Sequence, residues 1–115
     1  MKKIYHLSTC STCQRIIKDI NPGNEVKLQD IKANKITAQQ IDELKKMAGS
    51  YEALFSRRAM KYKSMGLAQK NLSQDDYRQL ILDEYTFLKR PVVVSGDRIF
   101  VGNSKKTVEA AKQGL

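Results

Sequence analysis

The sequence predicts an α/β protein with a mixed four-stranded sheet and a helical insertion between strands two and three. Short apolar runs typical of strands occur only near the two ends of the chain. They cover residues 3–7, 25–30, 92–94 and 98–101. Between the second and third runs, over about residues 37–85, the pattern is helical. No linker or repeat interrupts this order, so we expect a single domain over residues 1–115.

Caps and turn formers set the ends of the predicted elements. A first helix over residues 11–20 ends at the turn-forming residues 21–24. Thr37 begins an insertion helix with a capping box, in which Gln40 is the third helical residue. Further helices are expected over residues 50–57 and 58–65, from residue 73, and over 105–113. A tight turn at residues 95–97 joins the last two strands into a hairpin.

Composition narrows the class of protein. No apolar run approaches the roughly 20 residues that span a bilayer, and the N-terminus lacks the pattern of a signal peptide. We therefore expect a protein of the reducing cytoplasm, without a membrane partner. The net charge of +9 favours anionic ligands or acidic partners. The lysines are scattered without a basic run or interleaved aromatics, so direct nucleic-acid binding is not predicted.

Cys10 and Cys13 are the two cysteines of the chain, and they stand at the head of the predicted helix over residues 11–20. A thiol at a helix N-terminus meets unpaired N–H groups and the positive end of the helix dipole. Both stabilise a thiolate, which is the nucleophilic form of cysteine. Cys13 lies one turn further on and can close a disulfide with Cys10.

Two other uses of the cysteines stay open. Free cysteines often pack in cores, but both of these are surrounded by Ser and Thr. A Cys-X-X-Cys pair can also be half of a zinc site, although structural zinc takes four ligands. The chain offers only His6 as a further soft donor, so no metal is predicted.

The order of elements with Cys-X-X-Cys after strand one is the thioredoxin-like plan. Pro91, immediately before strand three, belongs to that plan, in which it takes a cis peptide facing the active cysteine. The alternative is a proline that merely begins a strand.

These residues resemble the arsenate reductase family of the thioredoxin-like fold, which includes the Spx redox regulators of transcription. The resemblance runs from Ile4 to about Ala111. It rests on Cys10 after strand one, the insertion, the Arg-Pro run at residues 89–94, and the Gly-Asp-Arg hairpin at 96–98.

The resemblance implies roles for individual residues. Cys10 falls on the nucleophile, and His6 falls on a histidine near it, where a histidinium would lower the thiol pKa. Simple packing is the alternative for His6. Arg90 falls on an arginine that binds an oxyanion through its guanidinium fork. Ser11 and Thr12 can donate hydrogen bonds to a bound oxyanion or simply supply polarity to the loop.

Three positions depart from the reductase pattern. Reductases use three arginines, but two of those positions hold Ser56 and Val101 here; Arg57 follows directly and is a candidate substitute. Arsenate-reducing members also lack a cysteine at the Cys13 position and rely on glutathione and glutaredoxin. Spx-type proteins do carry that second cysteine.

The resemblance therefore implies two functions. The first is a cytosolic thiol-dependent oxidoreductase with no bound cofactor, acting on a small oxyanion or a disulfide and reduced by glutathione/glutaredoxin or thioredoxin. The second is an Spx-like regulator that binds the RNA polymerase alpha subunit through residues 49–52 and Arg57 under control of a Cys10–Cys13 disulfide. Gly49 is equally an ordinary helix C-cap. A thiol–disulfide exchanger without an oxyanion site is a third alternative.

Overall fold

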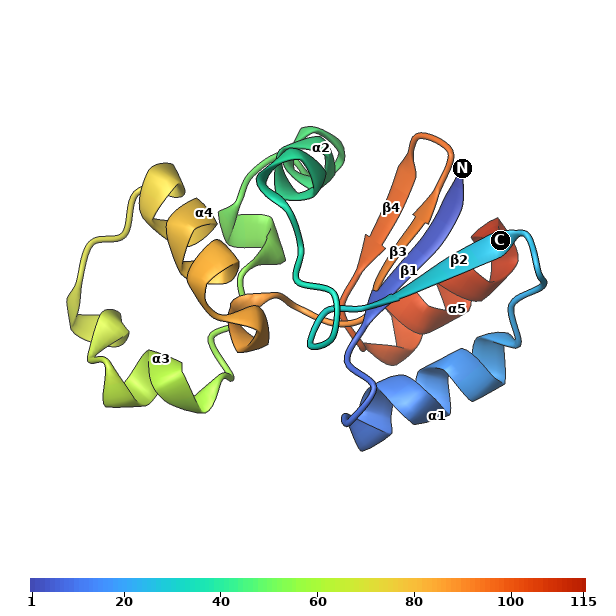
Figure 1. The fold of residues 1–115 in the computed structure, drawn as a ribbon, viewed down its shortest axis with the longest axis horizontal. Coiled ribbons are helices and arrows are strands. Elements are labelled where there is room, and N and C mark those ends of the chain that lie inside the picture. Colours follow the sequence, from blue (N-terminus) through green and yellow to red (C-terminus); the bar gives the residue numbers. More distant parts are fainter. The chain divides into compact units, whose positions relative to one another are not determined.

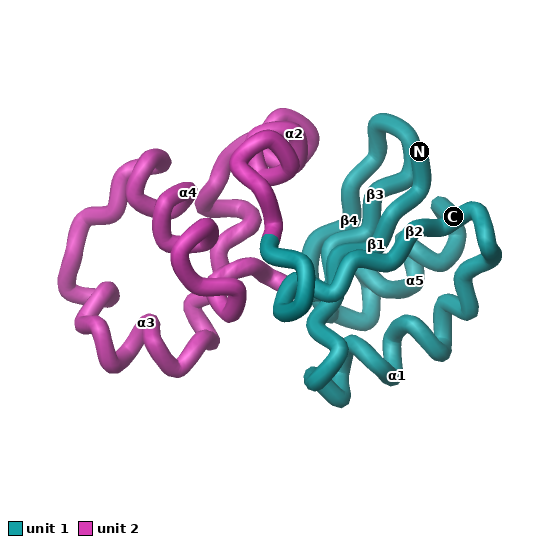
Figure 2. Tube along the Cα trace, in the orientation of Figure 1, with its two compact units in different colours: residues 1–35, 90–115 teal, residues 36–89 magenta.

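The computed structural model describes residues 1–115 and divides into two compact units (Figure 2). Unit 1 consists of Met1–Lys35 together with Arg90–Leu115, and unit 2 is Ile36–Lys89. The predicted insertion over residues 37–85 lies within unit 2.

Strands and two helices make up unit 1, and short helices make up unit 2 (Figure 1). The elements of unit 1 are β1 (Lys2–His6), α1 (Ser11–Ile20), β2 (Val26–Asp30), β3 (Val92–Ser95), β4 (Arg98–Val101) and α5 (Lys105–Gly114). The α-helices of unit 2 are α2 (Ala38–Ala48), α3 (Met60–Ser64) and α4 (Gln74–Asp83). Its 3₁₀ turns are η1 (Glu52–Leu54), η2 (Leu67–Gln69) and η3 (Tyr85–Phe87). None of the helices has the length and apolarity that crossing a bilayer requires.

The sheet of unit 1 has the strand order β2-β1-β3-β4. β1 pairs with β2 in parallel, and β1–β3 and β3–β4 are antiparallel. The predicted mixed four-stranded α/β architecture is confirmed. Because β1 and β2 are parallel, their carboxyl ends meet at one edge of the sheet, and their last residues His6 and Asp30 are register partners.

One face of this sheet is covered by α1 and α5 (Figure 1). Strand residues on this face pack with apolar residues of both helices. The buried members of the cluster are Ile4, Val26 and Val93 from the strands, Ile16 and Ile20 from α1, and Ala111 from α5. Ile16 and Ile20 are four residues apart and lie on the same side of α1, so their burial holds the helix against the sheet.

An aromatic cluster forms the centre of unit 2. The Phe55 ring stacks on Phe87 at 5.0 Å and meets Tyr77 and Tyr62 edge-on at 4.9 and 5.9 Å. The backbone beside Phe55 also pairs with the end of η3: the Ser56 N–H donates to the Phe87 carbonyl at 2.7 Å.

The expectation of a helix over residues 50–57 is wrong. Only the 3₁₀ turn Glu52–Leu54 forms there, and Phe55 is extended (φ −89°, ψ 129°). Extended backbone lets Phe55 bridge to Leu88 while its ring enters the aromatic cluster. The helix expected over residues 58–65 is shorter, Met60–Ser64, and buries none of its residues. The capping box of Thr37 and Gln40 is present as expected.

Candidate functional site

The cysteine site begins where β1 passes into α1. The N–H of Cys10 donates to the Leu7 carbonyl at 3.0 Å, which closes a tight turn after the strand. Cys10 is then the N-cap of α1, with extended backbone (φ −90°, ψ 116°). Its sulfur therefore lies beside the N–H groups of the first helical turn, which have no intrahelical acceptor.

Opposing effects act on the thiol of Cys10, and their balance lowers its pKa. Partial burial raises this pKa, but hydrogen bonds from the backbone and thiol of Cys13, the backbone of Thr12 and the Arg90 side chain together outweigh the burial. The neutral thiol makes no regular cap hydrogen bond. The nearby donors gain strength only when sulfur carries charge, and a donor that favours the charged form lowers an acid's pKa.

Cys13 has the opposite environment. It is 0% exposed, and burial raises the pKa of its thiol. A hydrogen bond from the Leu7 backbone lowers this pKa, but the neighbouring Cys10 raises it further, and the net shift is upward. The two cysteines thus differ: Cys10 is a partly exposed thiol with a lowered pKa, and Cys13 is a buried thiol with a raised pKa.

Arg90 reaches this site from the other end of the chain. It immediately precedes Pro91 and β3, and its guanidinium acts on both sulfurs. The Arg90–Pro91 peptide is cis, as expected from the sequence. The Gly102 N–H donates to the Pro91 carbonyl at 3.0 Å and ties this segment to the end of β4.

The surroundings of His6 disfavour the positive charge that the resemblance implied for it. Burial lowers the pKa of its imidazole, and Asp30 opposes this only in part. A lowered pKa favours the neutral imidazole over the histidinium that would stabilise a Cys10 thiolate. Its role at the site stays a prediction.

Ser11 and Thr12 occupy the first turn of α1. Ser11 is exposed and Thr12 is half-buried. It is the Thr12 backbone N–H that acts on Cys10. Hydrogen bonding of their hydroxyls to an oxyanion stays a prediction.

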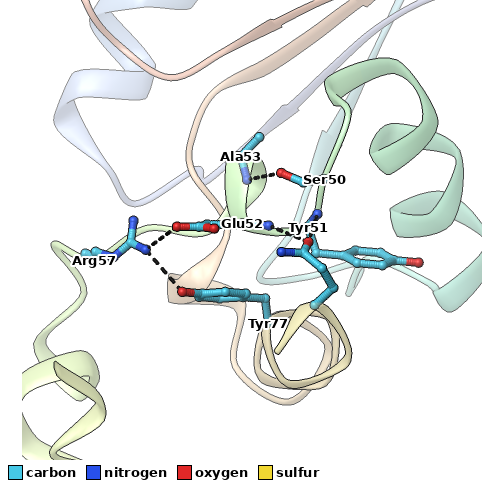
Figure 3. Close-up of polar contacts among 7 residues, drawn as sticks. Ser50, Tyr51, Glu52, Ala53, Arg57 and Tyr77 are labelled. Carbon is cyan, nitrogen blue, oxygen red and sulfur yellow. Dashed lines mark hydrogen bonds and ion pairs between the residues drawn. The ribbon is translucent and has the colours of Figure 1, made fainter. Parts of the chain in front are cut away.

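Arg57 belongs to unit 2 and is engaged there (Figure 3). Its Nη2 lies 2.7 Å from a carboxylate oxygen of Glu52 and 3.1 Å from the Tyr77 hydroxyl. Its guanidinium also lies 5.8 Å from the centre of the Tyr77 ring. These contacts account for Arg57 within its own unit, so substitution for a lost oxyanion arginine remains a prediction.

Residues 49–52, the expected polymerase-binding segment, are held by contacts within unit 2 (Figure 3). Gly49 ends α2 with φ +97°, a left-handed conformation that favours glycine. The Tyr51 N–H donates to the Gln74 side chain at 2.8 Å, and the Tyr51 hydroxyl donates to Asp42 at 2.6 Å. Arg78 also contacts Asp42 at 2.8 Å.

Asp42 gives this segment a pH-dependent anchor. Arg78 first, and then the Tyr51 hydroxyl, lower the Asp42 pKa to about 2. A free aspartate titrates near pH 3.9, so the stabilisation is present above about pH 4 and lost as the pH falls towards 2. Asp42→Asn is expected to unfold at lower urea concentration at pH 7, and its difference from wild type should shrink over that acid window.

The matched control is Glu43→Gln, which removes the same charge from the exposed neighbour on α2. It should show no comparable difference at pH 7. A wild-type advantage over Asp42→Asn that persists unchanged at pH 2 would contradict the assignment.

Arg90 is expected to control the reactivity of Cys10. Arg90→Gln should slow iodoacetamide alkylation of Cys10 at pH 7 about tenfold, because hydrogen bonds to charged groups contribute roughly 1.5–3 kcal/mol and only the thiolate reacts. The rate is followed by mass spectrometry with localisation of the label. Arg98→Gln removes an equal charge from the exposed end of β4 and should leave the rate unchanged; equal rates in the two variants would refute the role of Arg90.

Three residues near the cysteines were not identified from the sequence. Asp30 accepts hydrogen bonds from Ser8, and Gln14 donates to the Ser8 carbonyl. One signal was available: Asp30 ends a strand that is parallel to β1, so its side chain lies at the sheet edge from which the Cys10 turn departs.

Comparisons with known proteins agree with this fold. The ArsC family model matches residues 5–111. The uncharacterised protein YusI of Bacillus subtilis is 24% identical over 102 residues, 85% of this chain and 86% of YusI.

Solved structures show the same arrangement. An arsenate reductase from Vibrio cholerae superposes with a TM-score of 0.78 at 18% identity, covering 99% of this chain and 97% of that one. A Staphylococcus aureus protein solved by NMR gives 0.77 at 26% identity, covering 96% and 97%. The match over nearly the whole chain, together with the thioredoxin-like architecture, shows that this protein belongs to the ArsC family.

Proposed function

We propose that the protein is a thiol-dependent oxidoreductase of the cytoplasm, with Cys10 as nucleophile and Cys13 as resolving thiol. The observation that supports this most is the contrast between the two cysteines: the pKa of Cys10 is lowered and that of Cys13 is raised. A nucleophile must be ionised at working pH, whereas a resolving thiol acts only after the first bond has formed.

With an oxyanion such as arsenate, the first step forms a bond between the Cys10 sulfur and arsenic. An arsenate oxygen is protonated and leaves as water. The Arg90 guanidinium and the first-turn N–H groups of α1 hold the anion, with the Ser11 and Thr12 hydroxyls as further donors. Arsenic is still at the +5 level in this adduct.

The second step transfers two electrons to arsenic. The Cys13 sulfur attacks the Cys10 sulfur and loses its proton to an arsenic-bound oxygen. The sulfur–arsenic bond breaks with its electron pair on arsenic, so arsenite leaves and a Cys10–Cys13 disulfide remains. The 0% exposure of Cys13 suits this step, because a buried thiol meets Cys10 but not bulk solvent.

An external thiol donor then restores the dithiol, either thioredoxin or glutathione with glutaredoxin. With a disulfide substrate the same two cysteines act through a mixed disulfide on Cys10. Neither route calls for a metal, a nucleotide or a flavin.

The direct test is arsenate-dependent NADPH oxidation by the wild-type protein, coupled separately to thioredoxin with its reductase and to glutathione with glutaredoxin and glutathione reductase. Turnover with either donor would support oxyanion reduction, and the donor used would identify the partner. Absence of turnover with each of the two donors would exclude arsenate as substrate. A parallel assay with a small disulfide would then separate thiol–disulfide exchange from no reductase activity.

An Spx-like regulator is the second candidate, and the arrangement of unit 2 favours it. Arg57 pairs with Glu52, and Tyr51 is anchored on Asp42, so residues 49–52 offer a preorganised surface. In this alternative, oxidation of Cys10 and Cys13 changes the affinity for the RNA polymerase alpha subunit. Binding of purified alpha subunit by calorimetry should differ between oxidised and reduced protein. Absence of binding in both states would exclude this alternative.

A further inference from the structure

Ser8, in the turn between β1 and α1, is held from both sides. Its N–H and hydroxyl donate to the two carboxylate oxygens of Asp30, at 3.2 and 2.6 Å. On the other side, the Gln14 side-chain amide donates to the Ser8 carbonyl at 2.6 Å. Asp30 belongs to β2 and Gln14 to α1, so two separate elements hydrogen-bond to one residue of the turn.

These hydrogen bonds to Ser8 affect the surroundings of both cysteines. The turn that contains Ser8 is closed by the hydrogen bond from the Cys10 N–H to the Leu7 carbonyl. The Leu7 backbone also donates towards the Cys13 sulfur. A shift of the turn would therefore move the Cys10 sulfur relative to the helix N–H groups and at the same time change the hydrogen bonding of Cys13.

We propose that Asp30 is a positioning residue for the nucleophile Cys10. Asp30 acts through Ser8 and together with Gln14 to fix the turn over residues 7–10. The fixed turn places the Cys10 sulfur beside the first-turn N–H groups of α1. This inference rests on the proposed function and extends it to Ser8, Asp30 and Gln14, which act on Cys10 through the turn.

A carboxylate is suited to this task. Asp30 has two acceptor oxygens and no donor, and besides Ser8 it accepts the Lys32 N–H at 3.2 Å. The hydroxyl and N–H of Ser8 are the main reason that the Asp30 pKa is lowered, so the side chain is ionised at neutral pH. An asparagine would keep one acceptor and place an amide donor where the second oxygen accepts.

The charged groups around the turn make the test discriminating. The Cys10 sulfur interacts with Arg90 and Cys13, and Asp30 interacts with His6. If Asp30 acted only through its negative charge, its removal would favour a thiolate and speed the reaction of Cys10. Positioning predicts the opposite result, a slower reaction.

The experiment is the pH profile of iodoacetamide alkylation at Cys10 in the full chain. Asp30→Asn and Ser8→Ala are expected to react about threefold or more slowly than wild type at pH 7, with the profile moved to higher pH, because reactivity follows the thiolate fraction. Ser8→Thr keeps the hydroxyl and should restore the wild-type profile. Gln14→Ala releases the other side of the turn and should also slow the reaction.

Asp19→Asn is the charge-matched control, because Asp19 lies near the far end of α1, paired with Lys112 at 3.2 Å. It should not alter the profile. Unchanged or faster alkylation in Asp30→Asn and Ser8→Ala, with wild-type circular dichroism, would overturn the proposal. If Asp30→Asn alone fails to fold, the contrast between Ser8→Ala and Ser8→Thr decides: a slower Ser8→Ala beside a wild-type Ser8→Thr supports positioning, and equal wild-type profiles overturn it.

Failure of the proposed function is distinguishable from failure of this inference. Wild-type protein without reductase turnover, but with alkylation that depends on Ser8 and Asp30, would leave the positioning role intact. Turnover together with an alkylation profile insensitive to both residues would retain the oxidoreductase and remove the positioning role.

Discussion

Cys10→Ser is expected to lose all arsenate-dependent NADPH oxidation, with either thiol donor. A serine hydroxyl is un-ionised at neutral pH, so the helix N–H groups and Arg90 have no anion to stabilise at position 10. The assay is the coupled one proposed for the wild-type protein. Residual turnover in this variant above the protein-free rate would show that Cys10 is not the nucleophile.

Cys13→Ser separates the two routes of electron supply. The variant should still be alkylated at Cys10, because Thr12 and Arg90 continue to donate to that sulfur. It should lose turnover with thioredoxin, since no intramolecular disulfide can form for a dithiol donor to reduce. Turnover with glutathione and glutaredoxin would survive only if an external thiol can resolve the Cys10 adduct. Undiminished activity with thioredoxin would contradict the resolving role of Cys13.

Phe55→Ala is expected to lower the free energy of unfolding by about 3–5 kcal/mol, the range for large aromatic residues truncated in a core. Phe55 is 0% exposed and contacts the rings of Phe87, Tyr77 and Tyr62. Single domains are stable by only about 5–15 kcal/mol, so this one change removes a large part of the total. Urea denaturation followed by circular dichroism measures the loss.

Met60→Ala is the control for this prediction. Met60 is 89% exposed on α3, which buries none of its residues, so its truncation should change the unfolding free energy by less than about 0.5 kcal/mol. Similar midpoints for Phe55→Ala and Met60→Ala would show that the aromatic cluster does not stabilise unit 2.

Elements with strong local signals were predicted closely. The helix α1 spans Ser11–Ile20 as expected, and α2 begins after the Thr37 capping box. The hairpin of β3 and β4 follows from its tight turn. In each case the decisive contacts join residues only a few positions apart, so the sequence pattern contains them.

Residues 50–57 show where local signals are insufficient. Their composition suits a helix, yet Phe55 is extended because it bridges to Leu88 and its ring packs on Phe87. Burial of a large aromatic ring outweighs the small differences in helix propensity among neighbouring residues. That partner lies in a segment whose position in space no local pattern reveals.

The same division holds at the cysteines. The sequence shows the spacing of the two cysteines and predicts their place at the start of a helix. These two features are enough to predict a reactive thiol. The difference in pKa between the two thiols could not be predicted from the sequence. It depends on the burial of Cys13 and on Arg90, which lies 80 positions after Cys10. The hydrogen bonds between Ser8 and Asp30 likewise join residues 22 positions apart in the sequence. Helix caps and tight turns form between residues a few positions apart, so the sequence predicts where they occur. The pKa values of the thiols, and the exact placement of the turn that carries Cys10, depend on desolvation and on hydrogen bonds that form only when distant segments pack together.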